Sequence, residues 1–294
     1  DLRFDGGDKF AVTEPVAVTR ASWNDEAKAL LAGALEVYDT SAWGVSYSIP
    51  LSEDYSHSDQ IFQYVALMIM ASQDNTVVNI DEDADGSSTV ITLDEGESVL
   101  VCGNMPGYNN VVAGGQINAT HPVQVEMITG STYSRYQSRW YHITPTENWS
   151  CEYFNPVASL SGDDRSDVFV YNPHPFSITV KYERLVNGSS SINTYSVDPT
   201  TTRTIPINSL NTAQRFYTEN VTDTFYAFVA VDAVTRAGTH DWGLALVPNT
   251  SLSPALQIGW GPGRDALSST SPEGNYNPVW VTAVADTTVF IDFN

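Results

Sequence analysis

The chain has 294 residues and a formal net charge of −22, from 13 Lys and Arg against 35 Asp and Glu. A field this negative repels phosphate backbones, which argues against nucleic acid as a partner. Hydrophobic residues make up 42% of the chain, which excludes a disordered protein. The longest unbroken apolar run, Val65–Ala71, is far shorter than the roughly 20 residues that a membrane-spanning helix needs.

Only three of the basic residues are lysines, Lys9, Lys28 and Lys181. Repulsion among so many carboxylates destabilises the compact state at low salt. The composition therefore predicts a chain that works where salt or divalent cations screen its charge. Few lysines and many short Asp side chains are typical of halophilic proteins, and an acidic secreted protein from seawater is the alternative.

The first predicted element is an extended apolar run within residues 6–18. The next is the one helix expected in the chain, over residues 23–38, where acidic residues come first and Leu30 and Leu35 share a face. Most later runs are short, rich in Val, Ile, Thr and Tyr, and bounded by Asn, Asp, Gly or Pro, which predicts strands. Alternation, as in Thr76–Ile80, places one face of a strand inward, as antiparallel sandwiches require.

Three features recur in the same order along the chain. The first is a Gly-Gly pair followed by a Thr-x-Pro-Val-x-Val run, at residues 6–18 and 114–125, with a looser copy at 225–231. The second is a tryptophan, an alternating run and a proline, at residues 43–50, 140–145 and 242–248. The third is a pair of strand-like runs, at residues 64–80, 168–180 and 279–291. We expect the interior tryptophans to pack in the core.

Ordered matches at a period of about 100 residues predict an all-β fold of tandem antiparallel β-sandwich-like modules in three internal repeats, with one short helix in the first. The predicted modules are residues 1–113, which open mid-repeat, 114–221, and 222–294, which are incomplete. Either the native polypeptide continues or a neighbouring subunit supplies the remaining strands. Because an open sheet edge is a template for pairing, head-to-tail assembly is a hypothesis that follows.

The order of motifs in the first repeat resembles the domain named after the N-terminus of IgGFc-binding protein, which occurs in mucin-like animal proteins and, in tandem, in bacterial and archaeal surface proteins. The resemblance covers roughly residues 7–127 and is carried by residues 15–18, 43–47, 65–69, 74–80 and 92–97. The second copy departs from it, since Trp140 is followed by Tyr141 rather than Gly. The resemblance implies an extracellular, non-enzymatic adhesive or structural β-module. Immunoglobulin binding does not carry over, because no residues match it.

Asp81, Asp83 and Asp85 form a D-x-D-x-D-G run directly after a predicted strand. Short carboxylates at alternate positions converge on one hard cation while Gly86 permits the tight turn, so the run predicts calcium as a cofactor. The twelfth position of a helical calcium loop would be Thr92 rather than Glu, which excludes an EF-hand. A solvated acidic turn is the alternative.

Cys102 and Cys151 are the only cysteines. One disulfide between them would close a loop of about 50 residues, and a buried pair of free thiols is the alternative. Sequons that permit N-glycosylation occur at Asn118, Asn148, Asn187, Asn220 and Asn249.

Enzyme signatures are missing: there is no G-x-S-x-G elbow, no H-E-x-x-H and no Walker lysine, and the five histidines are scattered. The leading hypothesis is a secreted extracellular structural or adhesive protein of a halophilic microbe, a non-enzyme that self-associates into a filament or surface layer. One alternative is a monomeric adhesin that recognises glycans, a host surface or other surface proteins. Another is a secreted hydrolase that uses a pair of carboxylates.

Overall fold

The computed structural model describes residues 7, 9, 11–14, 16–22, 33–53, 55, 61–102, 110–131, 138–157, 165–186, 189–207, 212–231, 242–256 and 281–291. Within these ranges the regular structure consists of antiparallel strands and three short 3-10 turns, so the predicted all-β class is confirmed. No helix in this part of the chain is long and apolar enough to cross a membrane.

The first sandwich unit is a single bent sheet of seven strands, preceded by a two-stranded sheet of β1 (Thr19–Ser22) and β2 (Gly33–Glu36). Five strands follow the order β6-β5-β8-β4-β7, and two more pair with β8. Their bounds are β3 (Gly44–Ser48), β4 (Tyr64–Ala71), β5 (Thr76–Asp81), β6 (Thr89–Leu93), β7 (Ser98–Cys102), β8 (Gln116–Gly130) and β9 (Arg139–Ile143).

Strand β8 joins the two layers of this unit. Its residues 116–119 pair with β3 and β5, whereas residues 123–130 pair with β4 and β9, and Gly44 of β3 reaches Val123 across a register shift. One continuous strand therefore serves both layers, and the sheet bends along it.

The second unit has two separate sheets, a five-stranded one in the order β13-β12-β15-β10-β18 and a four-stranded one in the order β14-β11-β16-β17. The bounds are β10 (Glu152–Asn155), β11 (Ser166–Tyr171), β12 (Ile178–Val186), β13 (Ser189–Val197), β14 (Thr202–Ile207), β15 (Ala213–Tyr217), β16 (Tyr226–Val231), β17 (Trp242–Ala245) and β18 (Val247–Pro248). Short turns η1 (Thr40–Ala42), η2 (Thr146–Asn148) and η3 (Asn249–Ser251) follow β2, β9 and β18.

The two units share one strand arrangement. The layer β6-β5-β8-β3 corresponds to β13-β12-β15-β10, and the layer β7-β4-β8-β9 corresponds to β14-β11-β16-β17. Strands β15 and β16 take the places of the two halves of β8. The described residues thus contain this arrangement twice, and the three repeats and the module boundaries stay predictions.

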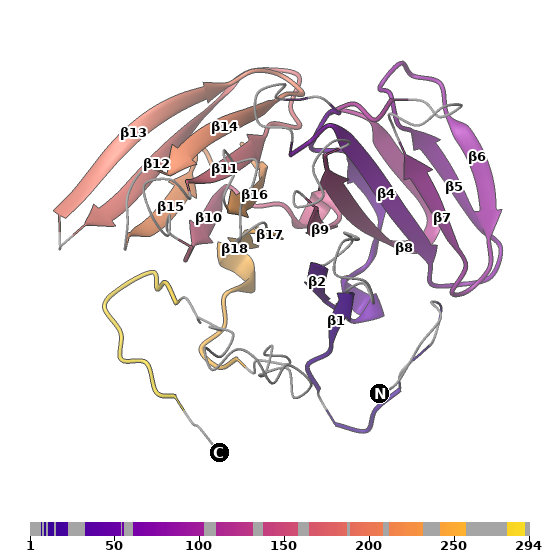
Figure 1. Ribbon diagram of the computed structural model, residues 1–294, viewed down its shortest axis with the longest axis horizontal. Coiled ribbons are helices and arrows are strands. Elements are labelled where there is room, and N and C mark those ends of the chain that lie inside the picture. The colour runs from indigo at the N-terminus through magenta and orange to yellow at the C-terminus, as the bar shows by residue number, and fades with distance from the viewer. Residues whose placement is uncertain are drawn as a thin grey trace, which may run out of the picture.

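The four-stranded sheet is the middle layer of the molecule (Figure 1). Its strands β11 and β16 are buried along their whole length. Val168 and Val229 on one face pack with the five-stranded sheet, whereas Phe169 and Phe228 on the other face belong to the core of the first unit. Continuous apolar strands of this kind are typical of sheets covered on both sides.

The predicted helix over residues 23–38 is wrong where the structure describes it. Gly33–Glu36 forms β2, which pairs in register with β1 from Thr19 opposite Glu36 to Ser22 opposite Gly33. Pairing with a neighbouring strand outweighs intrinsic helix propensity here. Residues 23–32 lie outside the described residues. The alternation predicted in β5 is confirmed, since Thr76, Val78 and Ile80 are all buried.

Candidate functional site

A buried tyrosine at the start of each unit ties the first strand to the strand opposite. In β3 the Tyr47 hydroxyl accepts a hydrogen bond from the Gly44 N–H at 2.9 Å and donates one to the Val123 carbonyl. In β10 the Tyr153 hydroxyl accepts from the N–H three residues earlier at 3.0 Å and donates to the Phe225 carbonyl at 2.7 Å. Burial raises the pKa of Tyr47 to about 12, which keeps its hydroxyl a donor.

The tryptophan that precedes each of these tyrosines follows a 3-10 turn and donates its indole N–H to the carbonyl five residues earlier. These tryptophans are Trp43 and Trp149, both followed by Tyr in a W-x-x-x-Y spacing. The internal repeat predicted from the sequence pairs Trp43 with Trp140, and the structure shows that this pairing is wrong. Trp140 lies in β9, which corresponds to β17 with its Trp242. The W-x-x-x-Y spacing was the signal that identifies the right pair.

An aromatic cluster fills the contact between the two units. Phe228 of the middle layer lies 4.9 Å from Tyr141 of β9 and 5.2 Å from Phe169, measured between ring centroids. Phe62 of the first unit meets Phe169 edge-on at 4.9 Å. Such edge-on and stacked pairs add specific geometry to apolar burial.

Hydrogen bonds around this cluster match donors of one unit with acceptors of the other. They join the Tyr226 hydroxyl to the His142 carbonyl (2.6 Å), the Arg139 guanidinium to the Val231 carbonyl (2.8 Å), the Tyr55 hydroxyl to the Thr202 carbonyl (2.8 Å), the Thr202 hydroxyl to the Pro50 carbonyl, and the Ser48 and Tyr171 hydroxyls to each other (2.9 Å). The units are therefore held in one relative orientation, because buried polar groups need their partners.

The predicted calcium residues come together in the loop between β5 and β6. One carboxylate oxygen each from Asp81, Asp83 and Asp85 lies within 4.8 Å of the others. Asp81 Oδ2 accepts from the Gly86 N–H at 3.2 Å, and Asp81 Oδ1 is buried without a hydrogen-bond partner among the described residues. Ala84 and Gly86 have φ of 57° and 87°, which curls the loop. Hard oxygen ligands and an unsatisfied carboxylate oxygen fit a calcium ion.

The two cysteines lie in different units as free thiols. Cys102 ends β7 and is buried beside Ile128 and Trp140, and this burial raises the pKa of its thiol. Cys151 is half-buried just before β10. The structure does not bring the pair together as a bridge.

The sequons differ in how open their side chains are. Asn118, Asn148 and Asn220 are exposed, although both amide atoms of Asn220 are paired within its own turn, to Thr222 and Asp223; Asn187 lies outside the described residues. Asn249 is engaged on both atoms of its amide: Oδ1 accepts from Ser150 Oγ at 2.8 Å, and Nδ2 donates to Glu152 Oε2 at 2.7 Å. A glycan on Asn249 would break this pairing.

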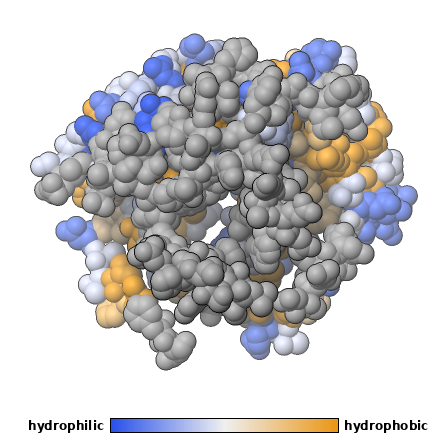
Figure 2. Space-filling model, viewed as in Figure 1, coloured by the Kyte–Doolittle hydropathy of each residue, from blue (hydrophilic) through white to orange (hydrophobic). Residues whose placement is uncertain are grey.

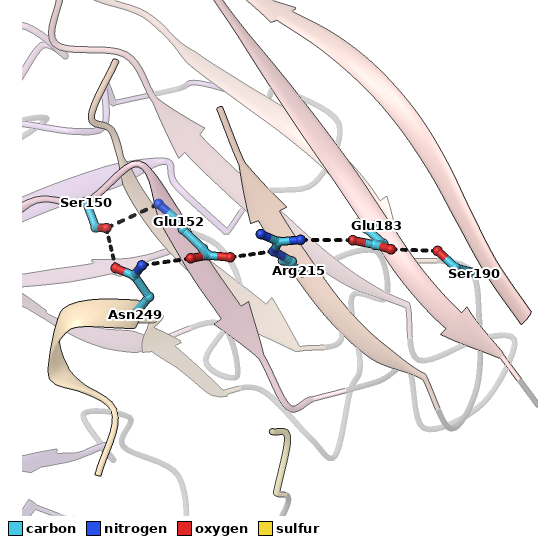
Figure 3. A network of polar contacts seen from close by, with 6 residues as sticks. All are labelled: Ser150, Glu152, Glu183, Ser190, Arg215 and Asn249. Carbon is cyan, nitrogen blue, oxygen red and sulfur yellow. Dashed lines mark hydrogen bonds and ion pairs between the residues drawn. The ribbon is translucent and has the colours of Figure 1, made fainter. Parts of the chain in front are cut away.

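Asn249 begins a chain of polar contacts across the five-stranded sheet (Figure 3). The Arg215 guanidinium at its centre donates to Glu152 at 2.5 Å and to Glu183 at 3.3 Å, and Ser190 donates to Glu183 at 2.6 Å. The network fixes η3 to β10. Turn η2 lies against β3 at the corresponding position. The Gly44 backbone and the Pro145 ring are in close contact there, since a Cβ at Gly44 would lie 2.5 Å from Pro145 Cβ.

Comparison with known proteins found no matching family model, no matching curated protein and no matching solved structure. The similarity of the first repeat to the IgGFc-binding domain stays a prediction.

Proposed function

We propose that this chain is an extracellular structural or adhesive protein, without enzymatic activity, that associates head to tail through its β-sheets. The observation that carries the proposal is the middle layer: the four-stranded sheet of the second unit completes the core of the first. Each unit thus offers one face that covers its neighbour and one that its neighbour covers. Such unlike faces form rings or filaments when they repeat.

The same contact is found again at the beginning of the described chain. Strand β2 lies against β9, as β9 lies against β17. Leu35 of β2 packs on the outer face of the first unit beside Ile128 and Trp140, just as Tyr141 of β9 packs on Phe228. The outer face of the first unit therefore has the character of a docking face, which supports an array of units in one direction.

Calcium would act at the junction of the two units in this proposal. Gly114 brings the acidic loop and the second unit together: a Cβ there would lie 3.9 Å from Ala84 Cβ and 3.5 Å from Thr200 Cβ. A cation held by Asp81, Asp83 and Asp85 would neutralise carboxylates close to this junction. Because the net charge is −22, the gain from neutralisation is greatest at low salt.

The test is multi-angle light scattering of the purified chain at low salt and in multimolar salt, in each case with calcium and then with a chelator. We expect particles of several times 32.1 kDa whose mass rises with concentration and falls on chelation. A 32.1 kDa monomer at all concentrations, indifferent to the chelator, would contradict both association and the calcium role.

A further inference from the structure

Residues 11–22 repeat the sequence and the pairing of β8. They share the Thr-x-Pro-Val-x-Val motif, and β1 pairs with β2 as the second half of β8 pairs with β9. The two valines of the motif are fully buried in β8. Their counterparts Val16 and Val18 are 57% and 36% exposed.

The difference in burial follows from the strands that flank β8. Val123 and Val125 lie opposite Ala71 and Ile69 of β4, and β5 covers the earlier residues. Strand β1 pairs only with β2 within the described part of the chain. The edge of β1 that corresponds to the β4 side of β8 is therefore open, and an open edge with apolar side chains is a template for another strand.

Residues 281–291 repeat the sequence of β4 and β5 without their structure. Thr287–Ile291 matches Thr76–Ile80, so Val289 and Ile291 stand where β5 has two fully buried side chains. Here the same positions are 51% and 65% exposed, and residues 281–291 form no strand. In Figure 1 it is the yellow trace apart from the sheets, and in Figure 2 its apolar residues are orange at the lower left.

The residues after η3 correspond to the beginning of β3, which follows η1, but residues 252–256 form no strand. Leu256 follows Leu252 by four positions, as Tyr47 follows Trp43. Leu256 is 83% exposed, whereas Tyr47 is buried against β8. Among the described residues, positions 252–256 and 281–291 thus carry counterparts of β3, β4 and β5 without a counterpart of β8, whereas positions 11–22 carry a counterpart of β8 without those three strands.

We propose that residues 281–291, with 252–256 beside them, add as strands to residues 11–22 of a second copy and complete a sandwich unit between the two copies. This inference rests on the proposed function and names the surfaces that would join. The occupant is a second copy. The donor and acceptor segments correspond to strands that pair with each other in the first unit, yet both are exposed in the single molecule, so they do not pair within it. Backbone pairing supplies affinity, and the alternate valines and isoleucine supply register.

The donor segment is tested with the double variant V289D/I291D, measured by sedimentation velocity across a concentration series. Charges at positions that become buried should raise the dissociation constant at least tenfold. The matched control is Phe290→Asn, which introduces the residue of β5 at that position, Asn79. Phe290 is 91% exposed, so association through general stickiness would be weakened more by the control than by the double variant. That order of effects would overturn the proposal.

The acceptor is tested with V16D/V18D against Ala17→Gln, since Gln124 is the residue of β8 there. All these positions lie outside both sandwich cores, so the variants should keep the wild-type far-UV circular dichroism. A mixture of the donor-defective and acceptor-defective chains should form a complex of two copies that grows no further. If the wild type associates and this mixture stays monomeric, the strand pairing is wrong while the proposed function stands. If the wild type itself never associates, the proposed function is wrong.

Discussion

Tyr47 and Tyr153 make the same pair of hydrogen bonds in successive units, each accepting from a backbone N–H three residues earlier and donating across to the opposite strand. Both rings are buried, so each hydroxyl satisfies two backbone groups that water does not reach. Each tyrosine thereby fixes the register between the first strand of a unit and the strand opposite it.

The Tyr47→Phe variant tests this role in the first unit. It removes both hydrogen bonds and leaves the Gly44 N–H and the Val123 carbonyl without this partner, which should lower the free energy of unfolding by about 1–3 kcal/mol. Urea denaturation followed by tryptophan fluorescence measures the change. Tyr195→Phe is the control: its half-buried ring on the otherwise largely exposed strand β13 is kept, so stability should shift by less than about 0.5 kcal/mol. Equal effects of the two variants would contradict the role.

Phe228→Ala tests whether the two units share one core. The ring lies against Tyr141 of the first unit and Phe169 of the second, so its loss leaves a cavity between them and should cost about 3–5 kcal/mol. We expect one unfolding transition at a lower urea concentration, seen equally by far-UV circular dichroism and fluorescence. Phe176→Ala, half exposed in the second unit, should change little. Two separate transitions in the wild type would show that the units unfold independently.

His142 should make the protein sensitive to mild acid. Burial lowers the pKa of His142 to about 4 from its ordinary 6.5, and its ring stacks on Tyr38 at 4.3 Å. Between these two values the unfolded chain binds a proton that the folded chain does not, so stability falls as the pH falls. The loss between pH 7.5 and 5 is about 2 kcal/mol.

The pH dependence is isolated by comparing the wild type with His142→Phe, which keeps an aromatic ring against Tyr38. Glu126 lies opposite His142 on β8, and burial raises its pKa while its ion pair with Arg20 opposes that shift. Glu126 therefore contributes with the opposite sign, but equally in both proteins. The wild type should lose about 2 kcal/mol more than the variant on acidification. A difference below 0.5 kcal/mol would contradict the prediction, as would the same effect from His121→Gln.

Calcium should stabilise the wild type through the loop between β5 and β6. Because the loop has three carboxylates, we expect a dissociation constant of about 10⁻⁴–10⁻³ M, as in extracellular calcium modules. Asp83→Asn should weaken binding at least tenfold in isothermal titration and remove the rise in melting temperature. Glu14→Gln changes the net charge equally at an exposed site away from the loop and should leave binding unchanged. Equal loss in both variants would indicate screening rather than a site.

The strands could be predicted from the sequence because their signals, alternation and the turn residues that bound each run, lie within a few neighbouring positions. The Thr76–Ile80 alternation alone gave the buried face of β5. Val45 is exposed, although Tyr47 and Ile49 at the following alternate positions are buried, because the register of β3 against β8 shifts between Gly44 and Ser46. A bulge of this kind has no sequence pattern of its own.

The middle layer could not be predicted from periodicity within one module. The runs Val168–Tyr171 and Tyr226–Val231 are continuously apolar, which indicates burial on both faces but not what covers them. The partner of the second face is the first unit, reached through contacts distant in sequence. The helix expected over 23–38 has the same explanation where it is described, since β2 depends on pairing with β1.

The sharing of one sheet by two cores also sets the geometry of any longer array. Since Phe169 and Phe228 fill the space between units, the rotation from one unit to the next depends on side-chain volume rather than on linker length. Lengthening a surface loop should leave that rotation unchanged, whereas resizing these two rings should alter it. The pitch of such an assembly would then depend on a few buried aromatic residues, because the rotation that they set is repeated at every unit.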